Sequence, residues 1–426
     1  MIIVLLLFSQ KLRCACIGLM MLHSFEMGLL RSPASKNHGK IRKYPKQKPY
    51  LCENFYFVKS NDFIAMNELF NIAGHFIDPK TIENIEPLGN GLINDTYKIM
   101  VRGKAQPKYV LQRINNAVFT DVDMLQNNIE TVTDHIRKKY ESQGVKNLDR
   151  RVLHFLKADT GKSYVVENEK YWRVMDFIAD SYTYEAVTPE YAYYAGRSFG
   201  DFESLLTDLK APIGEIIPDF HNIEFRLRQM EDAVAEDRIG QMREVEVQKF
   251  VDKIRAVADE MCLGERLYRE GKLPKRICHC DTKVNNMLFD KDGNVLCIID
   301  LDTIMPSFVF SDFGDFLRSA ANTGAEDDQD LDNVRFNMEV FEAFAKGYLE
   351  GTKSFLLPIE KENLPYAATL FPYMQAVRFL TDYINGNTYY KIRYPHHNLV
   401  RTRAQWKLFE EARAKMDEMK TVLFAQ

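Results

Sequence analysis

The most informative stretch of the sequence is HCDTKVNNMLFDKDGNVLCIIDLD, residues 279–302. It begins with a polar loop and continues as two short apolar runs, which are separated by the turn sequence DKDGN at residues 290–294. Apolar runs on either side of such a turn predict an antiparallel hairpin. Because the two strands run in opposite directions, Asn286 before the first strand and Asp300 after the second are expected at the same end. The pattern therefore brings two oxygen ligands together.

The same stretch supplies the groups that a phosphoryl-transfer reaction needs. Mg²⁺ takes one or two protein oxygens and completes its shell with phosphate and water, which suits Asn286 and Asp300. Asp281 lies five residues before Asn286, where a carboxylate accepts the proton of a substrate hydroxyl. We therefore predict Asp281 as the catalytic base and Asn286 with Asp300 as Mg²⁺ ligands beside ATP. The later DFG tripeptide, a metal-binding motif in protein kinases, follows no hairpin, so Asp312 or Asp315 is expected to brace the loop instead.

These residues resemble the aminoglycoside phosphotransferase and choline kinase superfamily, a two-lobed relative of the protein kinases. The resemblance runs from residue 85 to residue 408, and within the superfamily it is strongest for the N-acetylhexosamine 1-kinases. It is carried by the segments GLINDT (91–96), YVLQRIN (109–115), HCDTKVNN (279–286), IDLDT (299–303), MPS (305–307), RFLTDY (378–383) and HNL (397–399). It implies an α+β fold with a small antiparallel-sheet N-lobe and a larger, mainly helical C-lobe. It also implies the roles already given to Asp281, Asn286 and Asp300.

The remainder of the chain fits a leader followed by two lobes. The expected segments are a flexible basic leader at 1–65, an N-lobe at 66–180 and a C-lobe at 181–426. Strands are expected at 82–88, 96–101, 108–114, 151–153 and 171–175, and helices at 67–76, 121–139 and 250–261.

We interpret the leader as translated upstream sequence that precedes a start at Met66. Residues 31–48 carry seven Lys or Arg and no acid, and the apolar runs before them are too short to span a bilayer. An export signal and a basic membrane-surface tail are the alternatives. An export signal fits poorly, because the basic residues here follow the first apolar run and do not precede it.

The composition is that of an ordinary globular protein. The chain has 426 residues, of which 46% are hydrophobic and 27% charged, and its formal net charge is −4. It lacks the positive field of a nucleic-acid-binding protein, so small-molecule partners are favoured. The seven cysteines include no C-x-x-C pair, so we expect reduced thiols and a cytoplasmic location. No zinc site is expected at Cys278-His279-Cys280, because alternate side chains of an extended segment diverge. The oligomeric state stays open.

The nucleotide is expected on the N-lobe, where a glycine turn lies between two strands. The candidate phosphate-covering residues are Gly89, Gly91, Asn94 and Thr96. Backbone N–H groups of such turns bind phosphates, although an ordinary hairpin turn has the same pattern. Asp176 and Ile178 follow an apolar strand and are the candidate hinge that contacts adenine, with an ordinary strand end as the alternative.

The third strand departs from the wider kinase pattern. A lysine is expected there for the nucleotide phosphates, but the sequence has Gln112 and Arg113. Arg113 is our candidate for the missing positive charge, with Lys98 and Lys108 as substitutes.

The sequence thus predicts an ATP-dependent kinase that phosphorylates the anomeric 1-hydroxyl of an N-acetylhexosamine. The candidate sugar contacts are Asp302, Arg318, Arg378 and Asp382. An array of fixed donors and acceptors suits a polyhydroxylated ligand, although ordinary ion pairs use the same residues. One alternative is a kinase of another sugar or of a choline-like amino alcohol. The other, prompted by the missing lysine, is an inactive kinase fold that serves as a binding module.

Overall fold

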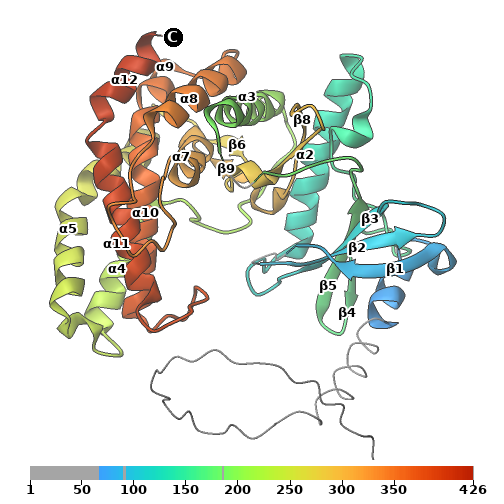
Figure 1. Cartoon of the computed structure of the whole chain (residues 1–426), viewed down its shortest axis with the longest axis horizontal. Coiled ribbons are helices and arrows are strands. Elements are labelled where there is room, and N and C mark those ends of the chain that lie inside the picture. Colours follow the sequence, from blue (N-terminus) through green and yellow to red (C-terminus); the bar gives the residue numbers. More distant parts are fainter. Residues whose placement is uncertain (1–66, 90–92, 185–186, 426) are drawn as a thin grey trace, which may run out of the picture. The chain divides into compact units, whose positions relative to one another are not determined.

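The computed structural model describes residues 67–89, 93–184 and 187–425, all of which belong to one unit of the chain, residues 57–426. An antiparallel-sheet lobe is followed by a mainly helical lobe, which confirms the predicted fold class (Figure 1). The expected leader, the expected start at Met66 and the candidate residue Gly91 lie outside the described residues.

The first lobe is built on a five-stranded sheet with the strand order β1-β2-β3-β5-β4. Its strands are β1 (Ile82–Pro87), β2 (Asp95–Val101), β3 (Tyr109–Ile114), β4 (Val165–Glu167) and β5 (Lys170–Asp176). Each neighbouring pair is antiparallel. The strand expected at residues 151–153 is wrong, because the segment follows the 3-10 turn η2 (Leu148–Arg150), and Val152 and Leu153 are buried without a ladder partner. Only Phe155, farther along, bridges to Met175 of β5.

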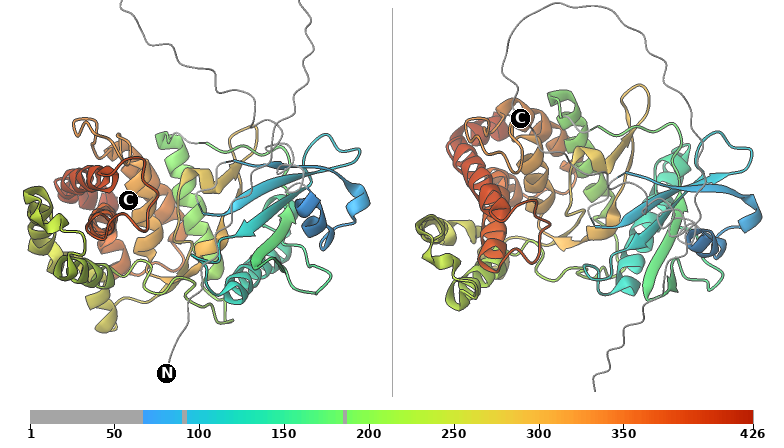
Figure 2. Two further views of the ribbon diagram at one scale, coloured as in Figure 1. Left: turned by 90° about the horizontal axis from the view of Figure 1, so that it is seen from below. Right: turned by 60° about the horizontal axis from the view of Figure 1, so that its bottom comes forward.

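Two helices cover opposite faces of this sheet. Residues 67–74 form one helix, which packs with Leu111 of β3. The other is α2 (Val122–Ser142), which begins where the Asp121 side chain accepts a hydrogen bond from the N–H of Met124. Because side chains alternate along β3, Gln112 faces α2, whereas Leu111 and Arg113 lie on the other face. Figure 2 shows α2, in teal, beside the sheet from two further directions.

The second lobe consists mainly of helices around one apolar core. They are α3 (Pro189–Leu206), α4 (Ile223–Glu236), α5 (Val245–Met261), α6 (Leu263–Arg269), α7 (Val309–Ala320), α8 (Met338–Thr352), α9 (Pro358–Glu362), α10 (Leu364–Ile384), α11 (His397–Arg413) and α12 (Met416–Ala425). α3 and α8 approach so closely that a Cβ atom on Gly196 would lie 2.1 Å from the carbonyl oxygen of Phe344. A side chain at residue 196 would therefore push the two helices apart, so their close packing requires glycine at this position. None of the helices in the described ranges is long and apolar enough to cross a membrane.

Two small ribbons hold the segment that carries the predicted active site. β6 (Arg276–Cys278) pairs with β9 (Met305–Ser307), and β7 (Met287–Phe289) pairs with β8 (Val295–Ile298). The second ribbon is the predicted hairpin. The stretch that carries the predicted active site is thus anchored at both ends inside the helical lobe.

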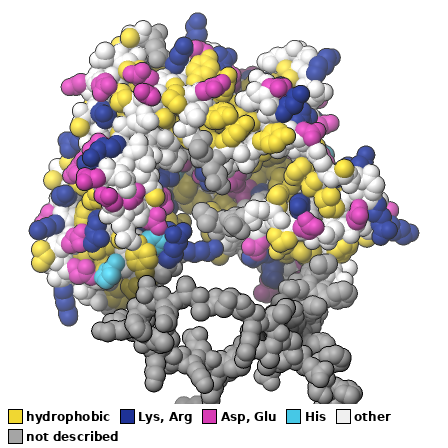
Figure 3. Space-filling model, in the orientation of Figure 1, with side chains coloured by type: hydrophobic (Ala, Val, Ile, Leu, Met, Phe, Trp, Pro, Cys, Tyr) yellow, Lys and Arg dark blue, Asp and Glu magenta, His cyan; other side chains and the backbone are white. Residues whose placement is uncertain are grey.

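On the face shown in Figure 3, basic and acidic side chains are interspersed, and the surface is hollowed between the two lobes.

Candidate active site

The loop between β6 and β7 is braced from behind by Asp312. The carboxylate of Asp312 accepts hydrogen bonds from the backbone N–H groups of His279, at 2.8 Å, and Cys280, at 2.7 Å. The hydroxyl of Thr282 donates to the carbonyl oxygen of Asp312 at 2.7 Å. Cys280 has a left-handed backbone with φ 61°, a conformation that these contacts stabilise. The geometry agrees with a bracing role for Asp312 and fixes the loop in front of Asp281.

His279 connects this loop to the second strand of the hairpin. Its ring is buried, and Nε2 hydrogen-bonds the carbonyl oxygen of Ile299 at 2.9 Å. The N–H of Ile299 in turn donates to the carbonyl oxygen of Asn286 at 2.9 Å. Asn286 and Asp300 therefore lie at the same end of the hairpin, as the antiparallel pairing requires.

Asp281 and Asn286 are held in direct contact. The amide nitrogen of Asn286 donates to the carbonyl oxygen of Asp281 at 2.8 Å and to its Oδ2 at 3.1 Å. The Nζ of Lys283 lies 2.9 Å from the same carboxylate oxygen. Burial alone would lower the pKa of Lys283, but Asp281 and Asp300 raise it, so the ammonium stays charged. A carboxylate, an amide and a cation are thus placed within one short loop.

Asp300 completes the set with a carboxylate that reaches solvent. Its backbone is left-handed, with φ 62°, directly after the paired part of β8. The protein around Asp300 displaces much of the water that would stabilise its negative charge, and this desolvation raises its pKa to about 6. Repulsion from the carboxylates of Asp302 and Asp281 adds to that increase. A divalent cation would remove this repulsion. Asp300 and the amide oxygen of Asn286 therefore fit a hard cation such as Mg²⁺ in their donor chemistry.

Asp302, two residues farther on, has a different environment. It is 3% exposed, and its Oδ1 accepts a hydrogen bond from Nη2 of Arg173 at 2.5 Å. Its Oδ2 accepts from the amide of Asn94 at 2.6 Å. Arg173 on β5 also donates to Gln112 on β3 and to Gln126 on α2. Asp302 therefore links the segment after β8 to the sheet lobe, and both of its oxygens are occupied without a sugar.

The structure separates the candidate residues of the third strand. Gln112 lies on the face that carries Arg173, and its amide donates to the hydroxyl of Thr96 at 3.2 Å. Arg113 points to the other face and pairs with Asp95 at 2.5 Å. The geometry therefore does not bring Arg113 toward Asp302. Lys98, one of the substitutes, pairs with Glu86 at 2.9 Å.

The other nucleotide candidates lie around the ends of the sheet. Gly89 has φ 68°, which suits a glycine turn. Asn94, besides holding Asp302, accepts a hydrogen bond from the N–H of Asn115 at 2.9 Å. Asp176 ends β5, where its carboxylate lies 2.8 Å from Nδ1 of His154. The carbonyl oxygen of Ile178 accepts from the Ser181 hydroxyl at 2.7 Å.

The remaining sugar candidates fall into two groups. Arg318 of α7 donates to Asp315 at 3.1 Å and to Glu326 at 3.0 Å. Burial opposes the charge of Arg318, but Asp315, Glu326 and Asp281 together raise its pKa. Arg318 is therefore held mainly by its own ion pairs with Asp315 and Glu326.

Arg378 and Asp382 both lie on α10. The guanidinium of Arg378 stacks between two aromatic rings, 5.6 Å from the ring centre of Phe220 and 5.7 Å from that of Tyr390. The carboxylate of Asp382 accepts from the backbone N–H groups of Thr388, Tyr389 and Tyr390 and from the amide of Asn398. Asp382 therefore orders the loop that carries Tyr390, and its oxygens are fully used in doing so.

A comparison with known families decides how these groups are to be interpreted. A model of a family described as "Phosphotransferase enzyme family" matches residues 84–354. The chain belongs to the phosphotransferase enzyme family. The match includes the braced loop, the hairpin and the sheet lobe.

Solved structures share the fold of this phosphotransferase. An aminoglycoside phosphotransferase from Alicyclobacillus acidocaldarius is 12% identical with a TM-score of 0.54, covering 84% of this chain and 96% of the other. A choline kinase from Cryptosporidium parvum is 13% identical with a TM-score of 0.52, covering 85% and 99%. An ethanolamine kinase from Plasmodium vivax is 15% identical with a TM-score of 0.53, covering 85% and 93%. At these identities the similarity concerns the fold alone.

A buried acid of the phosphotransferase, Glu203, was not predicted. It lies on α3 at 2% exposure, and its Oε2 accepts a hydrogen bond from the hydroxyl of Tyr348 at 2.7 Å. The carboxyl group lies beside Asp312 and Cys278. Burial, followed by the charge of Asp312, raises the pKa of Glu203 well above its usual range. The surroundings of Glu203 therefore favour its protonated, neutral form.

The trio of Glu203, Cys278 and Asp312 does not suit a metal. Burial raises the pKa of the Cys278 thiol well above its usual range, so the thiolate that a metal needs is disfavoured. The Asp312 oxygens already accept two backbone N–H groups. In the described part of the chain Cys262, Cys278, Cys280 and Cys297 are free thiols, as the cysteine spacing predicts.

Two further residues of the site were also missed. Lys283 had a signal, because it lies in the same loop two residues after Asp281. Arg173 had a weaker one, since it is a single cation within the apolar strand YWRVM. Their partners, Asp281 and Asp302, could only be assigned from the folded structure.

Proposed function

We propose that this phosphotransferase transfers the γ-phosphoryl group of ATP to the anomeric 1-hydroxyl of an N-acetylhexosamine. The observation that carries the proposal is the convergence of Asp281, Asn286 and Asp300 at one end of the hairpin, in a loop braced by Asp312. The choice of sugar rests on the sequence segments that resemble N-acetylhexosamine 1-kinases. Arg318 and Arg378 are the candidate sugar contacts that the geometry leaves available.

The proposed mechanism assigns the proton to Asp281. As the sugar oxygen forms its bond to the γ-phosphorus, the bond to the β–γ bridging oxygen breaks and ADP leaves. The Asp281 carboxylate accepts the hydroxyl proton and returns it to solvent. Asn286 and Asp300 would hold Mg²⁺, which would neutralise charge on the phosphates. The hydrogen bonds from Asn286 and Lys283 hold the Asp281 carboxylate in one orientation.

Lys283 is the proposed phosphate cation in place of the missing small-lobe lysine. Arg173 is buried and already bonds Asp302, Gln112 and Gln126. Lys283 is partly exposed, and among the described residues its one ion-pair partner is Asp281, so its ammonium is free to turn toward the γ-phosphate. Nucleotide contacts by Gly89, Gly91, Thr96, Asp176 and Ile178 remain part of the proposal, as does the lobe boundary near residue 180.

One observation bears on the choline-like alternative. A quaternary ammonium ligand needs the faces of several aromatic rings. Here the guanidinium of Arg378 already stacks on Phe220 and Tyr390. A fixed positive charge between the rings repels an ammonium group and suits the oxygens of a sugar. This arrangement favours a sugar over an amino alcohol.

The test is ATP turnover with N-acetylglucosamine, N-acetylgalactosamine, the parent hexoses and choline, with ³¹P NMR to locate the new phosphate. We expect an anomeric phosphate and the highest kcat/KM with one of the two N-acetylhexosamines. Comparable rates with all substrates would remove the sugar assignment, and the absence of turnover would favour the inactive binding module.

Asp281→Asn tests the base in the same assay. The substitution keeps the size of the side chain but removes its ability to accept a proton, so kcat is expected to fall about 10²- to 10⁴-fold. Nucleotide binding, measured by calorimetry, should remain. Asp292→Asn is the matched control, because Asp292 is exposed in the hairpin turn. Equal losses in the two variants would contradict the role of Asp281.

A further inference from the structure

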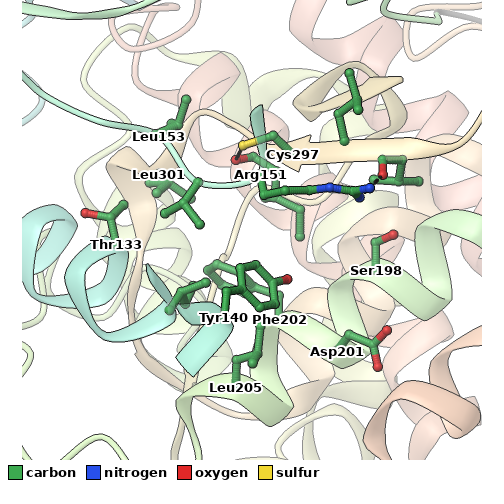
Figure 4. A pocket seen from close by; sticks show the side chains of 15 residues that line it. Thr133, Tyr140, Arg151, Leu153, Ser198, Asp201, Phe202, Leu205, Cys297 and Leu301 are labelled. Carbon is green, nitrogen blue, oxygen red and sulfur yellow. Dashed lines mark hydrogen bonds between the residues drawn. The ribbon is translucent and has the colours of Figure 1, made fainter. Parts of the chain in front are cut away.

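A cavity lies against the β7–β8 hairpin and is lined by none of the residues that were given a role above. It has a volume of about 210 Å³ and is lined mainly by α2, residues 151–153, α3 and β8 (Figure 4). An apolar cavity of roughly 150 Å³ holds a benzene molecule, so this space accommodates one ring with a short substituent. None of the roles proposed for phosphoryl transfer uses it.

The walls of the cavity divide into an apolar end and a polar end. Figure 4 shows Leu153, Leu301 and Thr133 at one end, while the guanidinium of Arg151 and the side chains of Ser198 and Asp201 are gathered at the other. The hydroxyl of Thr133 donates to the carbonyl oxygen of Ile129 within its own helix, so the first end offers no free polar group. A ligand that fits both ends has an apolar body and one polar head.

The charges at the polar end select an anionic head. Asp201 is already paired with Arg197 at 2.7 Å. Arg151 donates to the carbonyl oxygen of Val295 at 2.9 Å, and among the ion pairs of the described residues it has no carboxylate partner. Arg197 also contacts Glu350, at 3.4 Å. Arg151 is exposed and lines the cavity, and it is the cation of this lining whose guanidinium has no carboxylate bound to it among the described residues. A carboxylate matches the fork of a guanidinium better than a neutral group does.

Tyr140 adds a second donor to the same end. Its ring lines the cavity, and burial raises the pKa of its hydroxyl, which therefore stays protonated and able to donate. The Ser198 side chain lies nearby on α3. A hydroxyl pair beside a guanidinium is a suitable binding site for one carboxylate group.

The cavity is also connected to the proposed active site on two sides. Leu301 in its wall follows Asp300 directly in the chain, and β8 in its wall carries the end of the hairpin. Phe202, also in the wall, packs edge-on against His279, with ring centres 6.1 Å apart. A molecule that fills the cavity therefore supports both the metal-binding hairpin and the catalytic loop in their observed positions.

We propose that this cavity binds a small aromatic carboxylate, whose ring fills the apolar end and whose carboxylate contacts Arg151, and that its binding strengthens the binding of metal and ATP. The binding half of the proposal is independent of the reaction. The effect on ATP rests on the proposed function, because it acts through the loop that carries Asp281 and Asp300.

Phenylacetate is the probe, tested against the full chain by saturation-transfer NMR. Benzyl alcohol, which has the ring without the charge, and acetate, which has the charge without the ring, are the ligand controls. We expect a signal for phenylacetate that exceeds both controls. Equal signals for phenylacetate and benzyl alcohol would overturn the assignment to Arg151.

Three variants test the position of the site. Ser198→Leu fills the polar end, and Arg151→Gln removes the charge, so each is expected to weaken phenylacetate binding about tenfold or more. Arg151→Lys keeps the charge and is expected to keep most of the binding. Ser142→Leu makes the same change as Ser198→Leu at an exposed position near the end of α2 and serves as the control. Unchanged binding in Ser198→Leu would overturn the proposal.

The kinetic measurement separates the two halves. Saturating phenylacetate is expected to lower the KM for ATP about fivefold in the wild type, at the small end of known coupling effects, and to leave KM unchanged in Ser198→Leu. Binding with turnover but no change in KM would overturn the regulatory half. Binding without any turnover would leave the cavity assignment intact and count against the proposed function.

Discussion

Two pairs of acids contact the same catalytic loop and differ in almost every physical respect. Asp281 and Asp300 reach solvent, and their neighbours are the amide of Asn286 and the ammonium of Lys283. Glu203 and Asp312 are 2% and 0% exposed, respectively. The exposed pair gathers negative charge that a cation can neutralise, whereas burial in the second pair raises the pKa of Glu203 and so favours a proton on it. Access to solvent thus separates the acids proposed to take part in the reaction from those that hold the loop.

Removing charge from the exposed pair should have the largest effect on activity. Asp300→Asn keeps the shape of the ligand but weakens its grip on the cation, so kcat/KM is expected to fall about 10²- to 10³-fold, as when one charge-stabilising group is lost. The Mg²⁺ concentration for half-maximal turnover should rise at the same time. Magnesium titration of ATP turnover measures both, and chelation of the metal should stop the reaction.

The same variant should not destabilise the fold. Asp300 is repelled by Asp281 and Asp302, so its neutral analogue relieves an unfavourable interaction. The melting temperature, followed by circular dichroism without metal, should stay equal or rise. A clear fall would mean that Asp300 belongs with the structural acids.

The ion pair of Arg173 and Asp302 tests the link between the two lobes. Arg173→Met leaves Asp302 buried with only the amide of Asn94, and breaking a buried pair costs about 3–5 kcal/mol. Lys98→Met is the matched control on β2, because its pair with Glu86 is partly exposed and should be worth at most about 1 kcal/mol. Urea unfolding compares the two variants. Similar losses in both would show that Asp302 is not held by Arg173.

Some of these features of the site could be predicted from the sequence, and others could not. The hairpin and the convergence of Asn286 with Asp300 follow from local turn chemistry and strand alternation, so they were predictable. Asp302 could not be told apart from Asp300, because its partner Arg173 is remote in the sequence and becomes a neighbour only in the folded chain. The predicted strand at 151–153 failed for a related reason, since apolar residues are also buried in loops that pack on a helix.

Glu203 could not be predicted from the sequence for the same reason. Its position on α3 shows nothing unusual until α3, α7 and α8 are packed together around Asp312 and Tyr348. The domain boundaries and the individual nucleotide contacts were predicted from the resemblance and stay predictions.

Glu203→Gln tests the buried pair with a smaller, pH-dependent effect. The native state keeps a proton on Glu203, whereas the unfolded chain loses it near the ordinary pKa of 4.5. Because the native state then binds more protons, wild-type stability falls as pH rises above that value, by up to about 1.4 kcal/mol per unit. Glutamine carries its own N–H donor and does not titrate. The free energy of unfolding of the variant should therefore rise relative to that of the wild type between pH 5 and pH 7.

Urea unfolding at several pH values measures this difference. Glu342→Gln is the control, because Glu342 is exposed on α8. Parallel pH profiles for wild type and Glu203→Gln would mean that Glu203 is ionised in the native state, and the contrast between the two pairs of acids would fail.

The most direct test of the account is a crystal structure with Mg²⁺ and a non-hydrolysable ATP analogue. We predict a Mg²⁺ ion about 2.0–2.1 Å from both the amide oxygen of Asn286 and a carboxylate oxygen of Asp300, with Asp281 facing the γ-phosphate and Asp302 still bound to Arg173. A Mg²⁺ ion that contacts neither Asn286 nor Asp300 would contradict it.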